Sequence, residues 1–300
     1  MKIMSFVKNV IKKWVARVGR RHPEWVVRVR YLLRFHKRIN LDHPTDLNEK
    51  IQYLSLRTDT SEWSRLADKY AVRDYVTECG LGDTLVPLYG VWDSADDIDF
   101  DALPARFVLK CTHGSGDSII VHDKSQLDIP ATRALLSQTL SETYGLSEGN
   151  LHYSRIQPRV IAEALIDNDA ATAVRSSSLI DYKIWCFDGK AHYIWACSNR
   201  TKQSVRVMVY DTSWNAHPEY SVFTSHYQRD ELQPCPSHLD EMLAAAETLA
   251  KGFPVVRVDL YDVAGTIYFG EMTFTSLGAL MNFYTPAFLA KAGSLITLPQ

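Results

Sequence analysis

The chain has 300 residues, of which 46% are hydrophobic and 23% are charged, a composition that is ordinary for globular proteins. A folded chain of this size buries roughly 75% of the surface that its unfolded form exposes, which excludes a disordered chain, a collagen-like chain and a disulfide-stapled miniprotein. The net charge of −2 conceals an asymmetry. Residues 1–40 contain 12 Lys or Arg and one acid, Glu24, so they carry +11 and the other 260 residues carry −13.

The sequence predicts neither a membrane span nor a secretory signal, and its cysteines indicate a reducing compartment. No apolar run approaches the roughly 18 residues that a helix needs to cross a bilayer. Lys12 and Lys13 interrupt the first apolar stretch and no small-residue cleavage site follows, so we expect no secretory signal. The five cysteines are scattered without CxxC spacing, which favours free thiols and disfavours structural zinc.

A basic amphipathic helix is expected at the N-terminus, ended by Gly19 and the His22-Pro23 pair. Such a helix can lie in an anionic lipid interface or pack its apolar face against the protein's own body, and both interpretations stay open. A transit peptide shares this composition. Nucleic acid is not expected as a partner, because no aromatic platform or recognised binding motif accompanies the basic residues. The apolar face holds Ile3, Phe6, Val7, Val10, Ile11, Trp14 and Val18.

Helices and hairpins follow in chain order, without the regular alternation of a parallel sheet, so an α+β fold is expected. Helices are expected at residues 24–38, from a cap at Thr45 or Asp46 through Leu56, from Ser61 as N-cap to Gly80 and Gly82, at 130–144, and at 237–251 entered by Ser237. Strands are expected at 85–92, 106–112 and 159–166, within 204–215, and in hairpins at 181–199 and 255–274. Residues 112–123 are expected to form a glycine-containing loop, and 167–178 a polar loop.

The hairpin at 255–274 carries the most informative chemistry. Arg257 and Asp259 share one strand face, and a turn near residues 264–265 makes Glu271 the cross-strand neighbour of Asp259. Two adjacent carboxylates repel each other unless a cation bridges them, and oxygen ligands of this kind suit Mg²⁺. A merely charged outer face is the alternative. However, the apolar residues Val256 and Val258, which alternate with Arg257 and Asp259, indicate a hairpin of a core sheet.

Two features of the first half point to an anion and to a buried carboxylate. Lys110 ends a strand and is followed by a Gly-Ser-Gly loop, whose N–H groups could hold a phosphate. The spacing matches neither a P-loop nor GxGxxG, so a solvated lysine beside an ordinary turn is the alternative. Glu163 lies in the middle of an apolar strand, which is unusual for a carboxylate without a partner or a ligand.

These segments together resemble the TupA-like (teichuronopeptide biosynthesis) ATP-grasp proteins. The matching stretches cover about residues 45–298 and include "LNEKIQYL", "LADKYAVRDYV", "RFVLKCTHGSGDSIIV", "VIAEALI", "DYKIWCFDGK" and "VVRVDLYDVAGTIYFGEMTF". The resemblance implies an ATP-grasp fold in which two α+β lobes clasp the nucleotide. It divides the chain into a basic helical arm at 1–44 and an ATP-grasp domain at 45–300, with its N-terminal part at about 45–160 and its C-terminal lobe at 161–300.

The resemblance also assigns roles to individual residues. It implies that Lys69, Lys110 and Arg257 act on the phosphates in catalysis. Thr273 stands where superfamily ligases usually have Asn, and the Pro-Gly that often follows is missing. The implied nucleotide contacts are Lys69, Lys110, His113, Gly114, Ser115, Gly116, Glu163, Ala164, Leu165 and Lys183, and the implied ligands of Mg²⁺ or Mn²⁺ are Asp259, Glu271 and Thr273.

The implied activity is an ATP-dependent ligation. A carboxylate attacks the γ-phosphate to give an acylphosphate, and an amine then displaces phosphate to form an amide. The expected substrates are ATP, a carboxylate and an amine, with a sugar-linked acceptor from a cell-surface polysaccharide precursor. Residues 1–38 would hold the enzyme at the inner face of a bacterial inner membrane. A phosphotransferase, a glycosyltransferase-like enzyme and a degenerate nucleotide-binding scaffold are the alternatives.

Overall fold

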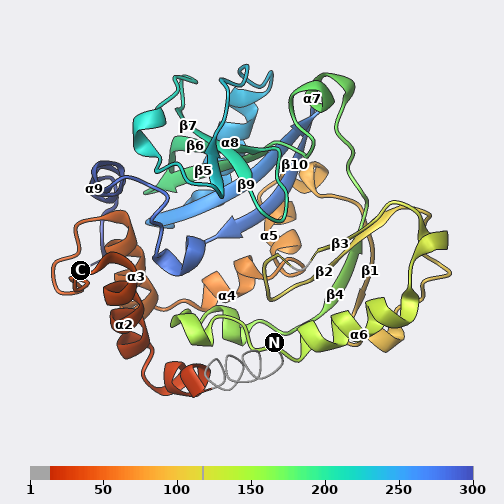
Figure 1. The fold of residues 1–300 in the computed structure, drawn as a ribbon, viewed down its shortest axis with the longest axis horizontal. Coiled ribbons are helices and arrows are strands. Elements are labelled where there is room, and N and C mark those ends of the chain that lie inside the picture. Colours follow the sequence, from red (N-terminus) through yellow and green to blue (C-terminus); the bar gives the residue numbers. More distant parts are fainter. Residues whose placement is uncertain (1–13, 117, 300) are drawn as a thin grey trace. The chain divides into compact units, whose positions relative to one another are not determined.

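A computed structural model describes residues 14–116 and 118–299 of the chain (Figure 1). The chain forms two compact units whose segments alternate along the sequence. Of the described residues, unit 1 contains 14–26, Thr60–Thr77 and those within Leu85–Ile166, and unit 2 contains Val27–Asp59, Glu78–Thr84 and 167–299. The family-based division at residues 44 and 160 stays a prediction.

The start of the described chain is helical and packs against unit 1. Residues 14–21 are helical, so this helix passes Gly19 and ends before the His22-Pro23 pair. A Cβ added at Gly19 would lie 2.0 Å from the carbonyl oxygen of Leu146, so the helix backbone touches that turn directly. The remainder of the predicted apolar face, Ile3 to Ile11, lies outside the described residues. The second predicted basic helix is confirmed as α2 (Pro23–Phe35).

In unit 1, the segment predicted as a single helix from Ser61 forms two helices, α4 (Ser61–Ala67) and α5 (Val72–Glu78). The break occurs because Asp68 Oδ1 accepts hydrogen bonds from the N–H groups of Tyr70 and Ala71, at 2.8 and 3.2 Å. These local bonds compete with the helical ones and start a new turn. The residue before α4 is Thr60, so the prediction of Ser61 as N-cap is wrong. The break places Lys69 outside both helices.

The sheet of unit 1 is antiparallel, in the order β1-β4-β2-β3. One face packs on α6 (Ile129–Leu140) around a core that includes Phe107, Leu109 and Val160. Because side chains alternate along a strand, the other face carries the intervening residues. The strands are β1 (Leu88–Trp92), β2 (Phe107–Cys111), β3 (Ile119–Val121) and β4 (Val160–Glu163), and the 3₁₀ helices are η2 (Ala95–Asp97), η3 (Lys124–Gln126), η4 (Leu146–Glu148) and η5 (Tyr153–Arg155).

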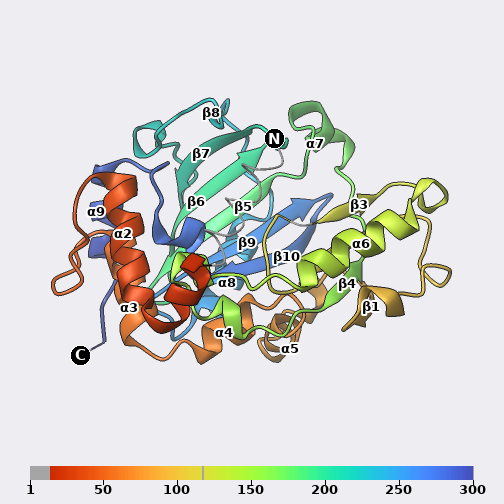
Figure 2. The ribbon, with the colours of Figure 1, turned by 60° about the horizontal axis from the view of Figure 1, so that its bottom comes forward.

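Unit 2 contains a larger sheet, in the order β10-β9-β5-β6-β7-β8 (Figure 2). Both predicted hairpins are confirmed: Asp188 and Gly189 join β5 to β6 with φ angles of 47° and 77°, as a tight hairpin turn requires. The parallel pairing of β8 with β7 was not predicted. The strands are β5 (Asp181–Phe187), β6 (Lys190–Ser198), β7 (Val205–Asp211), β8 (Tyr227–Arg229), β9 (Val255–Val263) and β10 (Thr266–Thr273).

The helices of unit 2 cover this sheet and extend beside it. In α3 (Leu47–Arg57), Asp46 is the cap, and its side chain and that of Glu49 form a reciprocal capping box. Helix α8 (Leu239–Ala250) begins after His238 and not at Ser237 as predicted. The segment predicted as a polar loop contains α7 (Ala170–Arg175), because Asp169 caps it by accepting from Thr172. The remaining helices are α9 (Pro286–Ser294), which was not predicted, η1 (Gly82–Thr84), η6 (Pro218–Tyr220) and η7 (Ser276–Ala279).

Largely antiparallel sheets with helices packed beside them confirm the α+β class in both units. Among residues 14–116 and 118–299, no helix combines the length and the apolar character that a membrane crossing needs.

Replacing Gly293 by Ala tests the close packing of α9 on the start of α3. The added Cβ would lie 2.3 Å from the carbonyl oxygen of Thr45, which is backbone and cannot simply rotate away. We expect the free energy of unfolding to fall by about 1–3 kcal/mol. Urea denaturation measures it, with Ser294→Ala on the exposed side of the same helix as control. Equal stability of the two variants would contradict this packing.

Candidate functional site

The predicted cross-strand pair in unit 2 is confirmed by the register of the sheet. Asp259 of β9 is directly opposite Glu271 of β10 on one side and Lys183 of β5 on the other. The register shifts between Phe269 and Glu271, because Gly270 forms a bulge. A bulge can re-aim the side chains that follow it. This shift sets Glu271, rather than Gly270, opposite Asp259.

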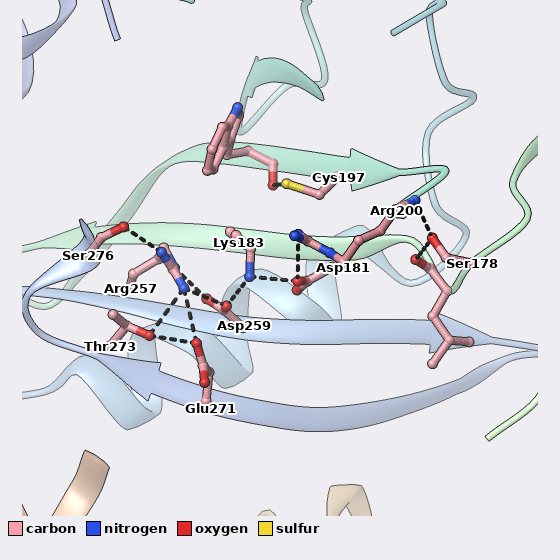
Figure 3. Close-up of polar contacts among 12 residues, drawn as sticks. Ser178, Asp181, Lys183, Cys197, Arg200, Arg257, Asp259, Glu271, Thr273 and Ser276 are labelled. Carbon is pink, nitrogen blue, oxygen red and sulfur yellow. Dashed lines mark hydrogen bonds and ion pairs between the residues drawn. The ribbon is translucent and has the colours of Figure 1, made fainter. Parts of the chain in front are cut away.

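Arg257 organises the charged groups on this face of the sheet (Figure 3). Its Nε and Nη2 donate to the two carboxylate oxygens of Asp259 at 2.7 and 2.8 Å, a bidentate contact. Its Nη2 also donates to Glu271 Oε1 and to Thr273 Oγ1, each at 3.1 Å. The Thr273 hydroxyl in turn donates to Glu271 Oε1 at 2.9 Å, and Arg257 Nη1 donates to Ser276 Oγ at 2.7 Å.

Lys183 joins two carboxylates of the same face. Its Nζ contacts Asp181 at 2.6 Å and also forms an ion pair with Asp259. Burial by itself lowers the pKa of the Lys183 ammonium, but the carboxylates of Asp181 and Asp259 outweigh burial and raise this pKa above its ordinary value. Lys183 therefore stays charged, and two buried cations face three carboxylates. We call Asp181, Lys183, Arg257, Asp259, Glu271 and Thr273 the carboxylate face of unit 2.

Unit 1 holds a second group of charges around Glu163. This side chain is 8% exposed and accepts from Lys110 Nζ of β2 at 2.7 Å and from Arg73 Nη1 of α5 at 3.0 Å. The mid-strand carboxylate that stood out in the sequence therefore has two cationic partners. Arg73 was missed by the sequence reasoning, because it precedes Glu163 by 90 residues and nothing local connects them. We call Arg73, Lys110 and Glu163 the Glu163 cluster.

The glycine loop of unit 1 is held at both ends. Lys69 Nζ donates to the carbonyl oxygen of Gly114, and the Lys69 N–H donates to Thr112 O at 3.3 Å. His113 is buried and its Nε2 lies 3.0 Å from the carbonyl oxygen of Glu142. Ser115 Oγ lies 2.6 Å from the hydroxyl of Tyr144. Gly116 has φ +81° with nothing within 4 Å of an added Cβ, so the tip of the loop is open.

Apolar side chains share the sheet face of Glu163 and were also missed. Val108 is opposite both Glu163 and Ile120, which places all three on one face. The side chain of Ile120 is 56% exposed, which is unusual for isoleucine in a strand. The alternation of side chains along β2 and β3 was the signal that could have indicated them. After β4 the chain continues through Ala164, whose N–H donates to Pro87 O at 2.9 Å, to the half-buried Leu165.

Comparison of the sequence with protein-family models identifies the family of this chain. The family model described as TupA-like ATPgrasp matches residues 49–295. The chain belongs to the TupA-like ATP-grasp family. Its two sheets with their helices are therefore an α+β ATP-grasp fold. No curated protein matches the sequence.

Solved structures show distant likeness to this TupA-like chain. The D-alanine–D-alanine ligase from Bacillus anthracis complexed with ATP is 16% identical, with 77% of this chain and 62% of that chain covered and a TM-score of 0.42. The corresponding ligase from Helicobacter pylori is 13% identical, with 84% and 70% covered and a TM-score of 0.43. The ATP-grasp ligase PsnB complexed with minimal precursor, Mg and ADP is 11% identical, with 75% and 57% covered and a TM-score of 0.37. This chain spans less than two thirds of the Bacillus anthracis ligase with ATP.

The oxygen donors of the carboxylate face fit the magnesium ion that the ATP-grasp family implies. Asp259 and Glu271 are adjacent carboxylates, and Thr273 adds a hydroxyl. The Glu271 side chain is 37% exposed, whereas that of Asp259 is 2% exposed and both its oxygens accept from Arg257, so a metal would bind Asp259 in place of one of its present contacts. Within the described part of the chain, no group of three or more His, Cys, Asp or Glu could hold a metal by itself. Mg²⁺ commonly binds one or two protein carboxylates and takes further oxygens from substrate phosphates, so this sparse set is sufficient.

Replacing Lys183 by Met tests the ion pairs of the carboxylate face. The buried carboxylates of Asp181 and Asp259 lose a cation, and removing one partner of a buried pair costs about 3–5 kcal/mol. We expect the free energy of unfolding at pH 7 to fall by about this amount in urea denaturation. Lys190→Met removes an exposed pair with Glu247 and should cost no more than about 1 kcal/mol. Similar losses in both variants would contradict the buried ion pairs.

Proposed function

We propose that this chain is an ATP- and Mg²⁺-dependent carboxylate–amine ligase. The observation that carries the proposal is the register of unit 2, which pairs Asp259 with Glu271 and lays Arg257 across both in a member of the ATP-grasp family. Adjacent carboxylates with an arginine suit a metal–phosphate substrate, because one part binds the cation and the other the anion.

We assign the nucleotide contacts of unit 1 to the glycine loop and to the face that bears Glu163. Lys69 and Lys110 would neutralise phosphate oxygens, and the open tip at Gly116, with His113, Gly114 and Ser115, would offer backbone N–H groups to them. Val108 and the exposed Ile120 would pack on the adenine ring. Glu163 with the following Ala164 and Leu165 would take the polar edge of the adenosine.

We assign charge stabilisation and metal binding to unit 2. Arg257 would stabilise the charge that develops on the transferred phosphoryl group, since its orientation is fixed in advance by Asp259 and Ser276. Lys183 would orient Asp259 and, with Arg257, oppose the burial that raises the pKa of this carboxyl. Asp259, Glu271 and Thr273 would hold Mg²⁺, which supplies neutralisation of phosphate charge. The protein needs no nucleophilic side chain, because a substrate carboxylate attacks the γ-phosphate and an amine then completes the amide.

We infer that the acceptor is a uronic acid or a peptide of a cell-surface polysaccharide precursor, joined to an amino acid or amine. The family resemblance supports this inference, and a uronic acid supplies the carboxylate that such a ligase must activate. A phosphotransferase would use the same nucleotide contacts and differ only in where the phosphate ends, so the product of the reaction distinguishes the two.

We further propose that the N-terminal helices bind the anionic inner face of a bacterial membrane. Helix α2 buries Val27 and Tyr31 on one side, and it exposes Trp25 (49%) and Leu32 (46%) on the other, with Leu33 (71%) next to Leu32. Trp25 and Leu32 lie seven positions apart and therefore share one face of the helix, which Leu33 adjoins. The +11 charge of residues 1–40 favours an anionic lipid surface, where each cation adds about 1 kcal/mol.

The ligase proposal predicts phosphate release from MgATP that depends on both a carboxylate and an amine. Pools of uronic acids and amino acids serve as probes. The Asp259→Asn/Glu271→Gln variant should lose at least about 100-fold in rate, because the metal and the oriented arginine are lost together. Glu247→Gln, at a half-buried carboxylate of α8 that pairs with Lys190, is the control and should keep full rate. Phosphate transfer to the acceptor would indicate a phosphotransferase, and full activity of the double variant would refute the metal assignment.

The membrane proposal predicts flotation of the protein with phosphatidylglycerol vesicles and not with pure phosphatidylcholine vesicles. Trp25→Ser/Leu33→Ser should lower the bound fraction about tenfold or more, since each large apolar side chain contributes about 1.5–3 kcal/mol on burial. The control is Val174→Ser, an 87% exposed apolar residue on α7. Equal recovery with both vesicle types, or self-association without vesicle binding in sedimentation velocity, would overturn this proposal.

A further inference from the structure

The chain that follows β10 has a strained turn beside the carboxylate face. Leu277, Gly278 and Ala279 have φ angles of 49°, 64° and 50°, three successive residues in the left-handed region. Only glycine adopts this region without strain, so Leu277 and Ala279 need surroundings that hold them there. Strain of this kind is typical of segments that position functional groups. We call residues 275–281 the strained turn.

Two side chains of α3 hold the strained turn by its backbone. Gln52 Nε2 donates to the carbonyl oxygen of Gly278 at 2.7 Å, and Asn48 Oδ1 accepts from the N–H of Met281 at 3.0 Å. The two residues are one helical turn apart, so they share a face, and both are essentially inaccessible to solvent. One bond fixes a carbonyl and the other an N–H, three residues further on. Together they restrain the middle of the left-handed stretch and the chain that follows it.

The buried polar face of α3 costs free energy of folding. Asn48, Gln52 and Ser55 follow one another at helical spacing and are all buried among Leu47, Ile51 and Leu54. Asn48 Nδ2, Gln52 Oε1 and Ser55 Oγ have no hydrogen-bond partner within the described residues. Apolar side chains would avoid that desolvation cost. What the two amides provide and apolar residues cannot is directional bonding to the strained turn.

The strained turn reaches the carboxylate face through Ser276. Its Oγ accepts a hydrogen bond from Arg257 Nη1 at 2.7 Å, on the edge of the guanidinium opposite to the Asp259 contact (Figure 3). Arg257 is thus held from both sides, by Asp259 of its own strand and by Ser276 of the turn. Movement of the turn would release one of these two constraints.

We propose that Asn48 and Gln52 are positioning residues, which hold the strained turn so that Ser276 fixes the guanidinium of Arg257 for phosphoryl transfer. The catalytic part of this inference rests on the proposed ligase function. The structural part, the restraint of residues 275–281 by α3, stands independently of any substrate.

Hydrogen exchange and ATP turnover test the two parts separately. Gln52→Met keeps the side-chain length but removes the donor to Gly278, and Ser55→Ala is the matched control, because it changes the same buried face without a bond to the turn. We expect amide exchange in residues 275–281 to accelerate about tenfold or more in Gln52→Met and to stay unchanged in Ser55→Ala. For ADP release from MgATP, Gln52→Met should lower kcat about tenfold and leave KM within about twofold, since Arg257 acts in the transition state.

Further variants keep the test decisive. Ser276→Ala should lower kcat as Gln52→Met does, without accelerating exchange. Asn48→Leu should accelerate exchange, whereas Asn48→Asp retains an acceptor for Met281 N–H and should restore slow exchange; this pair replaces Gln52→Met if that variant does not fold. Unchanged exchange in Gln52→Met and Asn48→Leu, or faster exchange with unchanged kcat, overturns the proposal. A wild-type protein that neither binds nor cleaves MgATP refutes the ligase instead, and exchange still decides the restraint.

Discussion

Buried charges must neutralise one another, and this requirement fixes much of unit 2. The carboxylate of Asp259 is almost fully enclosed, and an isolated ion in such a place would cost several kcal/mol. It is stable because Arg257 from its own strand and Lys183 from the neighbouring strand both contact it. That arrangement needs β5, β9 and β10 in one register, since a slip of one residue would turn every side chain to the opposite face. The hairpin turns and the bulge at Gly270 secure this register.

The same principle governs unit 1. Here a single buried carboxylate, Glu163, holds two cations, Lys110 and Arg73, at the sheet face on which Val108 and Ile120 also lie. Lys69 is tied to the glycine loop through the carbonyl of Gly114. Each unit therefore presents preorganised charge. In the proposed ligase, the cations of unit 1 would bind phosphate, and the carboxylates and arginine of unit 2 would bind the metal and stabilise the transferred group.

Some features of unit 2 lower the stability of the fold. The polar residues Asn48 and Gln52 occupy core positions of α3, and Leu277 and Ala279 adopt left-handed backbone angles. Each of these features is unfavourable alone. Together they hold the strained turn, and with it Ser276, beside Arg257. The solvent side of α2 is a feature of another kind, because it exposes Trp25 where its opposite face already packs on the protein.

Local chemistry allowed much of this to be predicted from the sequence. By itself it determined both hairpins, most of the longer helices and the pairing of Asp259 with Glu271, because side-chain alternation, caps and turns act over a few residues. Only the tertiary structure decided the pairing of Glu163 with Arg73 and the hold of Gln52 on Gly278, since these contacts join segments 90 and 226 residues apart. The sequence and the fold also explain different parts of the net charge of −2. The sequence separated a basic beginning from an acidic body, and the fold gathered the body's buried carboxylates around two cations that make them stable.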